Sequence, residues 1–298
     1  MDFSAVGQKI KELRKEMGIS QGELAEGICT QAQISKIEKG DVYPYASTLY
    51  LISQKLGVDV NYFFDIGMTP RLDYVQEVFQ QLKLARLSMN YNEIRQIVKA
   101  EENNPLFTQN SRNYQILLWH KGICEYEMNK DYKEAIKYIE QAISSTQTTE
   151  KRYSEREIEC LVSIAVIYFE EKMYDKALEI NKDALKYLNN LPYVSDNNLK
   201  SHLNYNIARI LTRMGRYDES IEYCKKGIKW CVQHNLLFAL PEFHYHLGYN
   251  HELKNEFQEA KNYMDKAYNI FEVTKETRFC TFIREKYAKW RNENKLPS

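Results

Sequence analysis

The sequence predicts an all-α protein: an N-terminal domain of five helices, then an α-solenoid of about five helix pairs and a C-terminal helix. Three observations support this prediction. The chain has only 11 Gly and 6 Pro among 298 residues, too few for the many turns of an all-β fold. Helix-capping patterns recur in the N-terminal part. Further along, an aromatic residue that opens a shared pattern recurs every 40 to 43 residues.

The first predicted helix covers residues 6–16. Val6, Ile10, Leu13 and Met17 share one helical face there, and Gly18 ends the helix.

A second helix begins after Ser20, since Ser20 and Glu23 have the spacing of a capping box, and it runs to about Ile28. Thr30 provides another cap for a third helix at about 31–39.

In the third helix Ile34 and Ile37 face inward, and the helix stops at Gly40. A fourth helix follows Pro44 with Leu49, Ile52 and Leu56 inward, and a fifth covers 60–64.

Two short helices that meet at a tight turn predict a helix-turn-helix, with the third helix as the reader of DNA. Glutamine bonds adenine bidentately, and recognition helices use their N-terminal residues for this purpose. Lysine suits phosphate or guanine, and a helix N-terminus suits phosphate. The candidate DNA-binding residues are Gln21, Thr30, Gln31, Gln33, Ser35, Lys36 and Lys39. The alternative is a small helical bundle with a solvated polar face.

The charge of this region limits the DNA prediction. Residues 1–66 hold seven basic and nine acidic side chains, so positive charge must be local and a monomer should bind DNA weakly.

The pattern S-Q-x-x-L-A-x-x-I-x-T-x-x-x-I-S-x-I-E-x-G at 20–40 resembles the XRE/Cro-repressor helix-turn-helix family. This resemblance implies that Gln31, Gln33 and Lys36 contact bases or backbone and that Gln21 contacts phosphate. It also implies a dimer on paired half-sites about one helical turn apart.

The repeat pattern predicts the solenoid. Its anchors are Tyr91, Tyr132, Tyr174, Tyr217 and Phe257. Small or apolar residues follow three, seven and ten positions later, on one helical face: Ala135/Ile139/Ala142, Ala177/Asn181/Ala184, Ser220/Cys224/Gly227 and Ala260/Met264/Ala267. A longer apolar helix precedes each anchor, and a final helix covers about 276–291. We therefore predict a DNA-binding domain at 1–66, a linker at 67–72 and a repeat domain at 73–292.

The first helix of each pair should line the concave side of the solenoid. Counting eleven residues back from each anchor gives Gln80, Lys121, Ser163, Asn206 and His246. Neighbouring inner positions hold Phe79, Lys83, Arg86, His120, Val166, Phe169, Tyr205, Arg209, Arg213, Tyr245 and Tyr249. Amides, cations and rings together suit an extended peptide. The alternative is a solvated face without a ligand.

The repeats resemble the tetratricopeptide repeat, including Leu247-Gly248 in the first helix of a pair. With the N-terminal module they resemble the RNPP family of peptide-pheromone receptors. Tyr205-Asn206 and the Arg216–Ser220 stretch contribute to this likeness, as does Val42-Tyr43-Pro44.

The RNPP resemblance implies a homodimer that binds a short, secreted and re-imported peptide. It also implies a pseudo-palindromic double-stranded DNA operator, with activation favoured over repression. Asn206 corresponds to an asparagine that bonds the peptide backbone, and Ser163 is its shorter counterpart one repeat earlier. Leu87 and Met89 stand where ligand-binding lysines are expected, so Lys83, Arg86 or Lys121 are the substitutes.

Other classes of function lack support. No apolar run reaches the ~20 residues that cross a bilayer, and the N-terminus resembles no signal peptide, which favours a cytoplasmic protein without membrane contact. The six cysteines are scattered and suit core packing. We find no P-loop, G-x-S-x-G or H-E-x-x-H, and therefore predict no enzyme activity, cofactor or metal. A ligand-independent repressor whose repeats only dimerise or dock another protein is the alternative function.

Overall fold

The computed structural model describes residues 3–69, 71–147, 152–237 and 239–295, and all regular secondary structure in these ranges is helical. The chain divides into two compact units, Met1–His120 and Lys121–Ser298, which are described one at a time.

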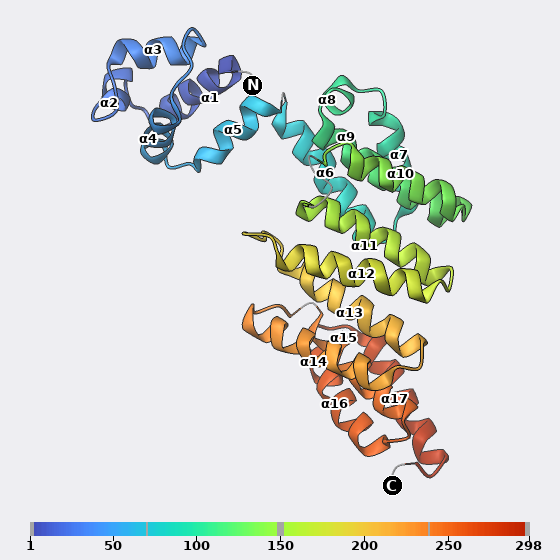
Figure 1. Ribbon diagram of the computed structural model, residues 1–298. Helices are drawn as coiled ribbons and strands as arrows, with labels where there is room; N and C mark the ends of the chain where they lie inside the picture. Colours follow the sequence, from blue (N-terminus) through green and yellow to red (C-terminus); the bar gives the residue numbers. More distant parts are fainter. Residues whose placement is uncertain (1–2, 70, 148–151, 238, 296–298) are drawn as a thin grey trace. The chain divides into compact units, whose positions relative to one another are not determined.

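The first unit contains eight helices and most of a ninth (Figure 1). They are α1 (Phe3–Glu16), α2 (Gln21–Ala25), α3 (Gln31–Lys39), α4 (Ala46–Leu56), α5 (Val60–Met68), α6 (Leu72–Leu87), α7 (Tyr91–Glu101), α8 (Pro105–Thr108) and α9 (Ser111–Cys124).

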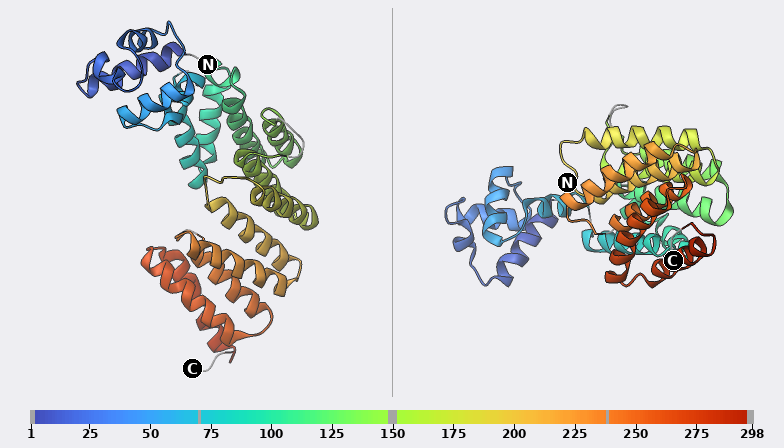
Figure 2. Two further views of the ribbon diagram at one scale, coloured as in Figure 1. Left: turned by 60° about the vertical axis from the view of Figure 1, so that its left-hand side comes forward. Right: turned by 90° about the horizontal axis from the view of Figure 1, so that it is seen from below.

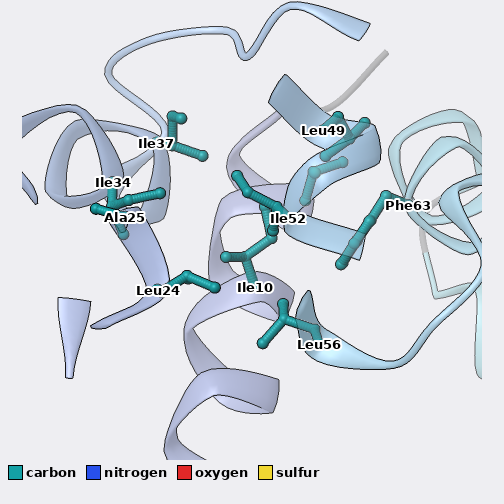
Figure 3. Packing of buried hydrophobic residues seen from close by; sticks show 10 residues of the cluster. Ile10, Leu24, Ala25, Ile34, Ile37, Leu49, Ile52, Leu56 and Phe63 are labelled. Carbon is teal, nitrogen blue, oxygen red and sulfur yellow. The ribbon is translucent and has the colours of Figure 1, made fainter. Parts of the chain in front are cut away.

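Helices α1 to α5 share one hydrophobic core, in which Ile10, Leu24, Ile34, Ile52 and Phe63 are fully buried (Figure 3). The predicted inward residues of the five helices meet in this core, which confirms the predicted five-helix module. Where α1 crosses α3, a side chain would not fit: a Cβ atom at Gly7 would lie 2.0 Å from the carbonyl oxygen of Ile37. Glycine therefore sets the close approach of these two helices.

The predicted caps of α2 and α3 are confirmed. Ser20 Oγ accepts from the Glu23 amide at 3.1 Å, and the Glu23 carboxylate accepts from the Ser20 amide at 2.6 Å, a complete capping box. Thr30 Oγ1 accepts from the Gln33 amide at 3.2 Å. Gly40 ends α3 with a φ of 78°, a conformation that favours glycine.

Three details of the prediction were wrong. Helix α2 ends at Ala25, three residues early, because Gly27 turns left-handed at a φ of 76°. Met17 is 51% exposed, because it follows the end of α1 beyond the shared core. Helix α5 continues to Met68, past its predicted end at 64. The predicted linker at 67–72 stays a prediction: its first residues belong to α5, Leu72 begins α6, and Pro70 lies outside the described residues.

The second unit is a stack of helices (Figures 1 and 2). It holds the end of α9, the π-helix η1 (Glu125–Asn129), α10 (Tyr132–Ser144), α11 (Glu155–Glu170), α12 (Tyr174–Asn189), α13 (Asn198–Arg213), α14 (Tyr217–Gln233), α15 (Leu240–Leu253), α16 (Phe257–Val273) and α17 (Thr277–Asn292). From α10 to α17, each helix packs against the next, as expected of a solenoid.

The anchor aromatic residues are each the first residue of a helix: Tyr91, Tyr132, Tyr174, Tyr217 and Phe257 begin α7, α10, α12, α14 and α16. The small residues three positions later are fully buried, as predicted. Gly248 permits a close approach, since a Cβ atom there would lie 2.7 Å from the Ala260 carbonyl oxygen. Small residues on both helices thus let each pair pack closely.

The turns within the helix pairs share one backbone conformation. Two residues before the second helix of each pair, and before α17, stands a residue with positive φ: Met89, Lys130, Lys172, Gly215, Asn255 and Lys275. Only one of these residues is glycine.

Some features were not predicted. They include α8, which Asn104 and Pro105 begin, and the single π-helical turn η1 that ends the α9 segment. In the described part of the chain, no helix is long and apolar enough to span a membrane.

Candidate functional sites

Helix α3 presents polar side chains along one face, with glutamines at its N-terminal end and lysines in its last turn. Thr30, Gln31, Lys36 and Lys39 are exposed, whereas Gln33 and Ser35 are half-buried. Ile34 and Ile37 attach the opposite face to the core. The arrangement gives α3 one buried face and one polar face that amide and ammonium donors occupy.

A chain of polar contacts connects α1, α2 and α3. Arg14 Nε and Nη2 donate to the two carboxylate oxygens of Glu38 at 2.5 and 3.0 Å. Gln21 Nε2 donates to Glu38 Oε2 at 2.8 Å, and Gln31 Nε2 donates to Gln21 Oε1 at 2.8 Å. Gln21 and Gln31, two predicted DNA contacts, are thereby held against each other and against a buried ion pair.

Glu38 carries a charge although its side chain is only 2% exposed. Burial opposes ionisation, but hydrogen bonds from Arg14 and Gln21 and the Arg14 charge outweigh it, so the pKa of Glu38 lies below its usual value. Sequence reasoning missed Arg14 and Glu38 as contributors to this site. The Ile37-Glu38 step of the motif was visible, but nothing in it identifies a partner 24 residues away.

In the second unit, a small pocket of about 10 Å³, here called the amide pocket, lies between α11, α12 and α13. It is lined by Ala165, Val166, Phe169, Asn181, Asn206, Arg209 and Ile210. Four of these residues were predicted: Val166, Phe169, Asn206 and Arg209. The Arg209 guanidinium lies 4.7 Å from the centre of the Phe169 ring, so a cation–π contact holds it at the rim.

Asn181 was not predicted to line a ligand site. Its Nδ2 donates to the Ala177 carbonyl at 2.8 Å, and its Oδ1 is buried without a hydrogen-bond partner. The corresponding positions of three other repeats hold Ile139, Cys224 and Met264. A buried acceptor without a donor is costly, so its place beside the amide pocket points to a donor supplied from that pocket.

A larger pocket of about 410 Å³, here called the cationic pocket, lies between α13, α15 and α17. It is lined by Tyr205, Arg209, Thr212, Arg213, Tyr245, His246, Tyr249, Phe282 and Lys286. Arg209 belongs to both pockets. The volume is in the range of ordinary ligand sites, and the lining combines aromatic rings with cations.

The cationic pocket is positively charged. Lys286 Nζ lies 2.5 Å from Glu252 Oε2, which offsets its charge, but Arg209 and Arg213 form no ion pair within the described residues. Burial raises the pKa of Tyr205 to about 12, so this ring is a neutral hydroxyl donor at physiological pH.

The floor of the cationic pocket is a buried polar network. Thr212 Oγ1 lies 2.9 Å from His246 Nε2 and 2.8 Å from Asn250 Oδ1, and Asn250 Nδ2 donates to Ser220 Oγ at 3.0 Å. Burial, with smaller effects of the Arg209 and Arg213 charges, lowers the pKa of His246 to about 4. The histidine is therefore neutral at physiological pH, and it is only 7% exposed, so the floor of the pocket carries no charge.

The predicted peptide-binding residues divide into three groups. Nine of them line the two pockets: Val166, Phe169, Tyr205, Asn206, Arg209, Arg213, Tyr245, His246 and Tyr249. Two lie elsewhere in the second unit: the Lys121 ammonium is 5.2 Å from the centre of the Tyr138 ring, and Ser163 Oγ donates to the Glu159 carbonyl at 3.2 Å. The remaining ones belong to the first unit and stay predictions: Phe79, Gln80, Lys83, Arg86 and His120.

Six pocket residues escaped the sequence analysis. Ala165 and Ile210 are apolar chain neighbours of the predicted Val166 and Arg209. Phe282 and Lys286 come from α17, which lies outside the repeats that were counted. Asn181 belongs to the second helix of its pair, whereas only first helices were expected to line the groove. Thr212 lies on α13 between the inner positions Arg209 and Arg213 and was not counted with them. Among the described residues, no three His, Cys, Asp or Glu side chains lie together as metal ligands.

Comparison with known proteins gives two family matches. The RNPP family C-terminal domain matches residues 80–290, and the helix-turn-helix matches residues 10–63. No curated protein sequence matches the chain.

Solved structures with the same fold cover nearly the whole chain. PlcR of Bacillus thuringiensis in complex with the peptide PapR7 and DNA has a TM-score of 0.83 at 24% identity, over 95% of this chain and 98% of that one. The SHP pheromone receptor Rgg2 of Streptococcus dysgalactiae has a TM-score of 0.65 at 16% identity, over 95% and 99%. ComR of S. thermophilus, in complex with DNA and its signalling peptide ComS, has a TM-score of 0.61 at 17% identity, over 94% and 98%.

The family match from 80 to 290 covers more than two thirds of the chain, and the solved structures share its fold. The chain therefore belongs to the RNPP family, with a helix-turn-helix domain ahead of the family's C-terminal repeat domain.

Proposed function

We propose that the protein is a transcription regulator whose binding to a DNA operator is controlled by a short signalling peptide. The observation that carries this proposal is that nine residues chosen from repeat spacing line two pockets that share Arg209. PlcR and ComR, which share the fold, bind both a peptide and DNA.

In this proposal DNA binding belongs to residues 1–66, and peptide binding and dimerisation belong to 73–292. The N-terminal end of α3 enters the major groove, where Gln31 and Gln33 read bases while Lys36 and Lys39 bind phosphate. Gln21 positions Gln31 through their 2.8 Å hydrogen bond and lies beside the phosphates. The regulator acts in the cytoplasm as a homodimer and catalyses no reaction.

Peptide binding uses the backbone-recognising amide of Asn206 in the amide pocket and the rings of Tyr205, Tyr245 and Tyr249 in the cationic pocket. For the peptide to control the operator, it must bind the DNA-competent arrangement of the dimer with a different affinity from the other arrangement.

The test begins with selection of duplexes from a random DNA pool by the full-length protein. We expect a pseudo-palindrome whose half-sites are spaced by about one helical turn, roughly 10 base pairs, or a multiple of it. Operator affinity is then measured with and without peptides captured from a synthetic heptapeptide library.

Asn206→Ala should abolish the peptide response and leave operator binding intact, while Asn262→Ala, at an exposed site on α16, should respond like the wild type. An operator affinity that no captured peptide changes would instead support a ligand-independent repressor.

A further inference from the structure

The cationic pocket has the chemistry of an anion site. Arg209 and Arg213 lie one turn apart on α13, so their side chains share a face of that helix. Neither forms an ion pair with a carboxylate of the described residues, and both line the same pocket of about 410 Å³. Two unpaired guanidinium groups that meet at a pocket favour a ligand with a planar, negatively charged group.

The other residues of the cationic pocket neither neutralise these arginines nor add further unpaired positive charge. Lys286 is already neutralised by Glu252, whose other oxygen accepts from Trp290 Nε1 at 3.0 Å. None of the described residues that line the pocket is acidic. The floor, made by Thr212 and His246, is occupied by internal hydrogen bonds. The uncompensated positive charge of the pocket therefore comes from Arg209 and Arg213.

The surrounding rings favour a peptide over a small inorganic anion. Tyr245 and Tyr249 are nearly parallel, at an angle of 6°, and Phe282 lies 5.9 Å from Tyr245 between ring centres. Aromatic walls of this kind pack against apolar side chains next to a charged group. Arg209 also borders the amide pocket, where Asn206 and Asn181 offer peptide-bonding groups.

We propose that the cationic pocket anchors a carboxylate of the bound peptide between Arg209 and Arg213. This inference rests on the proposed function. The carboxylate belongs either to an Asp or Glu side chain or to the peptide C-terminus, and both sources present the same planar group to the guanidinium forks.

The experiment uses the full-length protein and a synthetic heptapeptide library with free carboxyl termini. Captured peptides are sequenced by mass spectrometry, and the most enriched one is resynthesised in two altered forms. One form has each Asp or Glu replaced by Asn or Gln, and the other has a C-terminal amide. Calorimetry compares their affinities with that of the parent peptide.

We expect one of the two altered forms to bind about 10- to 100-fold more weakly, the usual effect of a charge-assisted hydrogen bond. Which form weakens identifies the source of the carboxylate. The same alteration of the peptide should hardly reduce its affinity for the Arg213→Gln variant, because that variant has already lost the carboxylate anchor. Arg213 is exposed, so this variant keeps the fold even if Arg209→Gln, which loses the Phe169 contact, does not.

Lys225→Gln is the matched control, since this exposed lysine on α14 lies outside both pockets and should keep the wild-type preference. Captured peptides that bind equally well in all three forms would overturn the carboxylate anchor and leave peptide sensing intact. Failure to capture any peptide would overturn both the anchor and the proposed function.

Discussion

Gly7 offers a direct test of how α1 positions the DNA-reading helix α3. Replacement by alanine would put a Cβ atom 2.0 Å from the Ile37 carbonyl oxygen, about 1.4 Å short of the 3.4 Å at which ordinary contact begins. The obstructing atom is backbone, so no side-chain rotation relieves the clash. Either α1 or α3 must move.

The expected cost follows from two opposing effects. Overpacking of this kind costs about 1–3 kcal/mol, and the higher helix propensity of alanine returns about 1 kcal/mol. Because the clash is with backbone, the overpacking cost lies at the upper end of this range. We therefore expect Gly7→Ala to lower the free energy of local unfolding of α1 and α3 by about 2 kcal/mol, a factor of roughly 30 in the open population.

Gly22 is the matched control, because it is a helical glycine in the same module without the clash. A Cβ atom there would meet only Ser20 Oγ, at 3.7 Å, so Gly22→Ala should stabilise α2 by about 0.5–1 kcal/mol.

Amide hydrogen exchange, read by mass spectrometry on peptides from α1 to α5, measures both changes locally. This readout is needed because the three Trp residues, at 119, 230 and 290, lie outside these helices. Exchange in α1 and α3 should be faster in Gly7→Ala and slower or unchanged in Gly22→Ala. Equal protection in the two variants would refute the view that glycine sets the α1–α3 distance.

Three further predictions concern buried polar groups. Arg14→Met strands the Glu38 carboxylate and should destabilise α1 to α5 by about 3–5 kcal/mol in the same exchange experiment, whereas wild-type protection would mean that the ion pair is dispensable. His246 has a pKa of about 4 when folded and 6.5 when unfolded, so the unfolded chain binds more protons below pH 6.5 and stability falls as pH drops from 6.5 towards 4. At pH 5 this loss is about 2 kcal/mol, measurable as a change in urea unfolding followed by tryptophan fluorescence; His246→Gln should lack it, and an unchanged pH profile in that variant would disprove the assignment. Asn181→Leu removes a buried acceptor that has no donor, so it should raise the free energy of unfolding in the urea assay by about 1 kcal/mol and weaken peptide binding. A lower free energy of unfolding with unchanged peptide affinity would make Asn181 a purely structural residue.

The helices were predictable because local chemistry determines them. The anchor aromatic residues are the first residues of their helices, and Ser20 and Thr30 cap α2 and α3 as expected. Small residues at fixed offsets in the repeats identified the buried helix face. These signals act over a few residues, so they can be read without knowing the fold.

Features that depend on distant partners were not predictable. Arg14 and Glu38 resemble surface charges in the sequence, and only the crossing of α1 and α3 makes them a buried pair. His246 lines the cationic pocket, but the sequence did not show that its imidazole also bonds Thr212, which lies on another helix. Lys286 reaches the pocket from a helix that follows the last repeat. Periodicity identifies the face of a helix and not its distant neighbours.

The repeated left-handed turn has a consequence for how this array can change. Lys130, Lys172, Asn255 and Lys275 each adopt a positive φ without being glycine, a conformation that costs an L-residue about 1 kcal/mol. Each pair of helices in a solenoid contributes nearly independently to the total stability. The same small conformational cost therefore recurs at several separate turns, and none of these residues lines either pocket. Exchange for glycine at one of these turns would stabilise the fold and so offset a destabilising substitution that alters ligand specificity in a pocket.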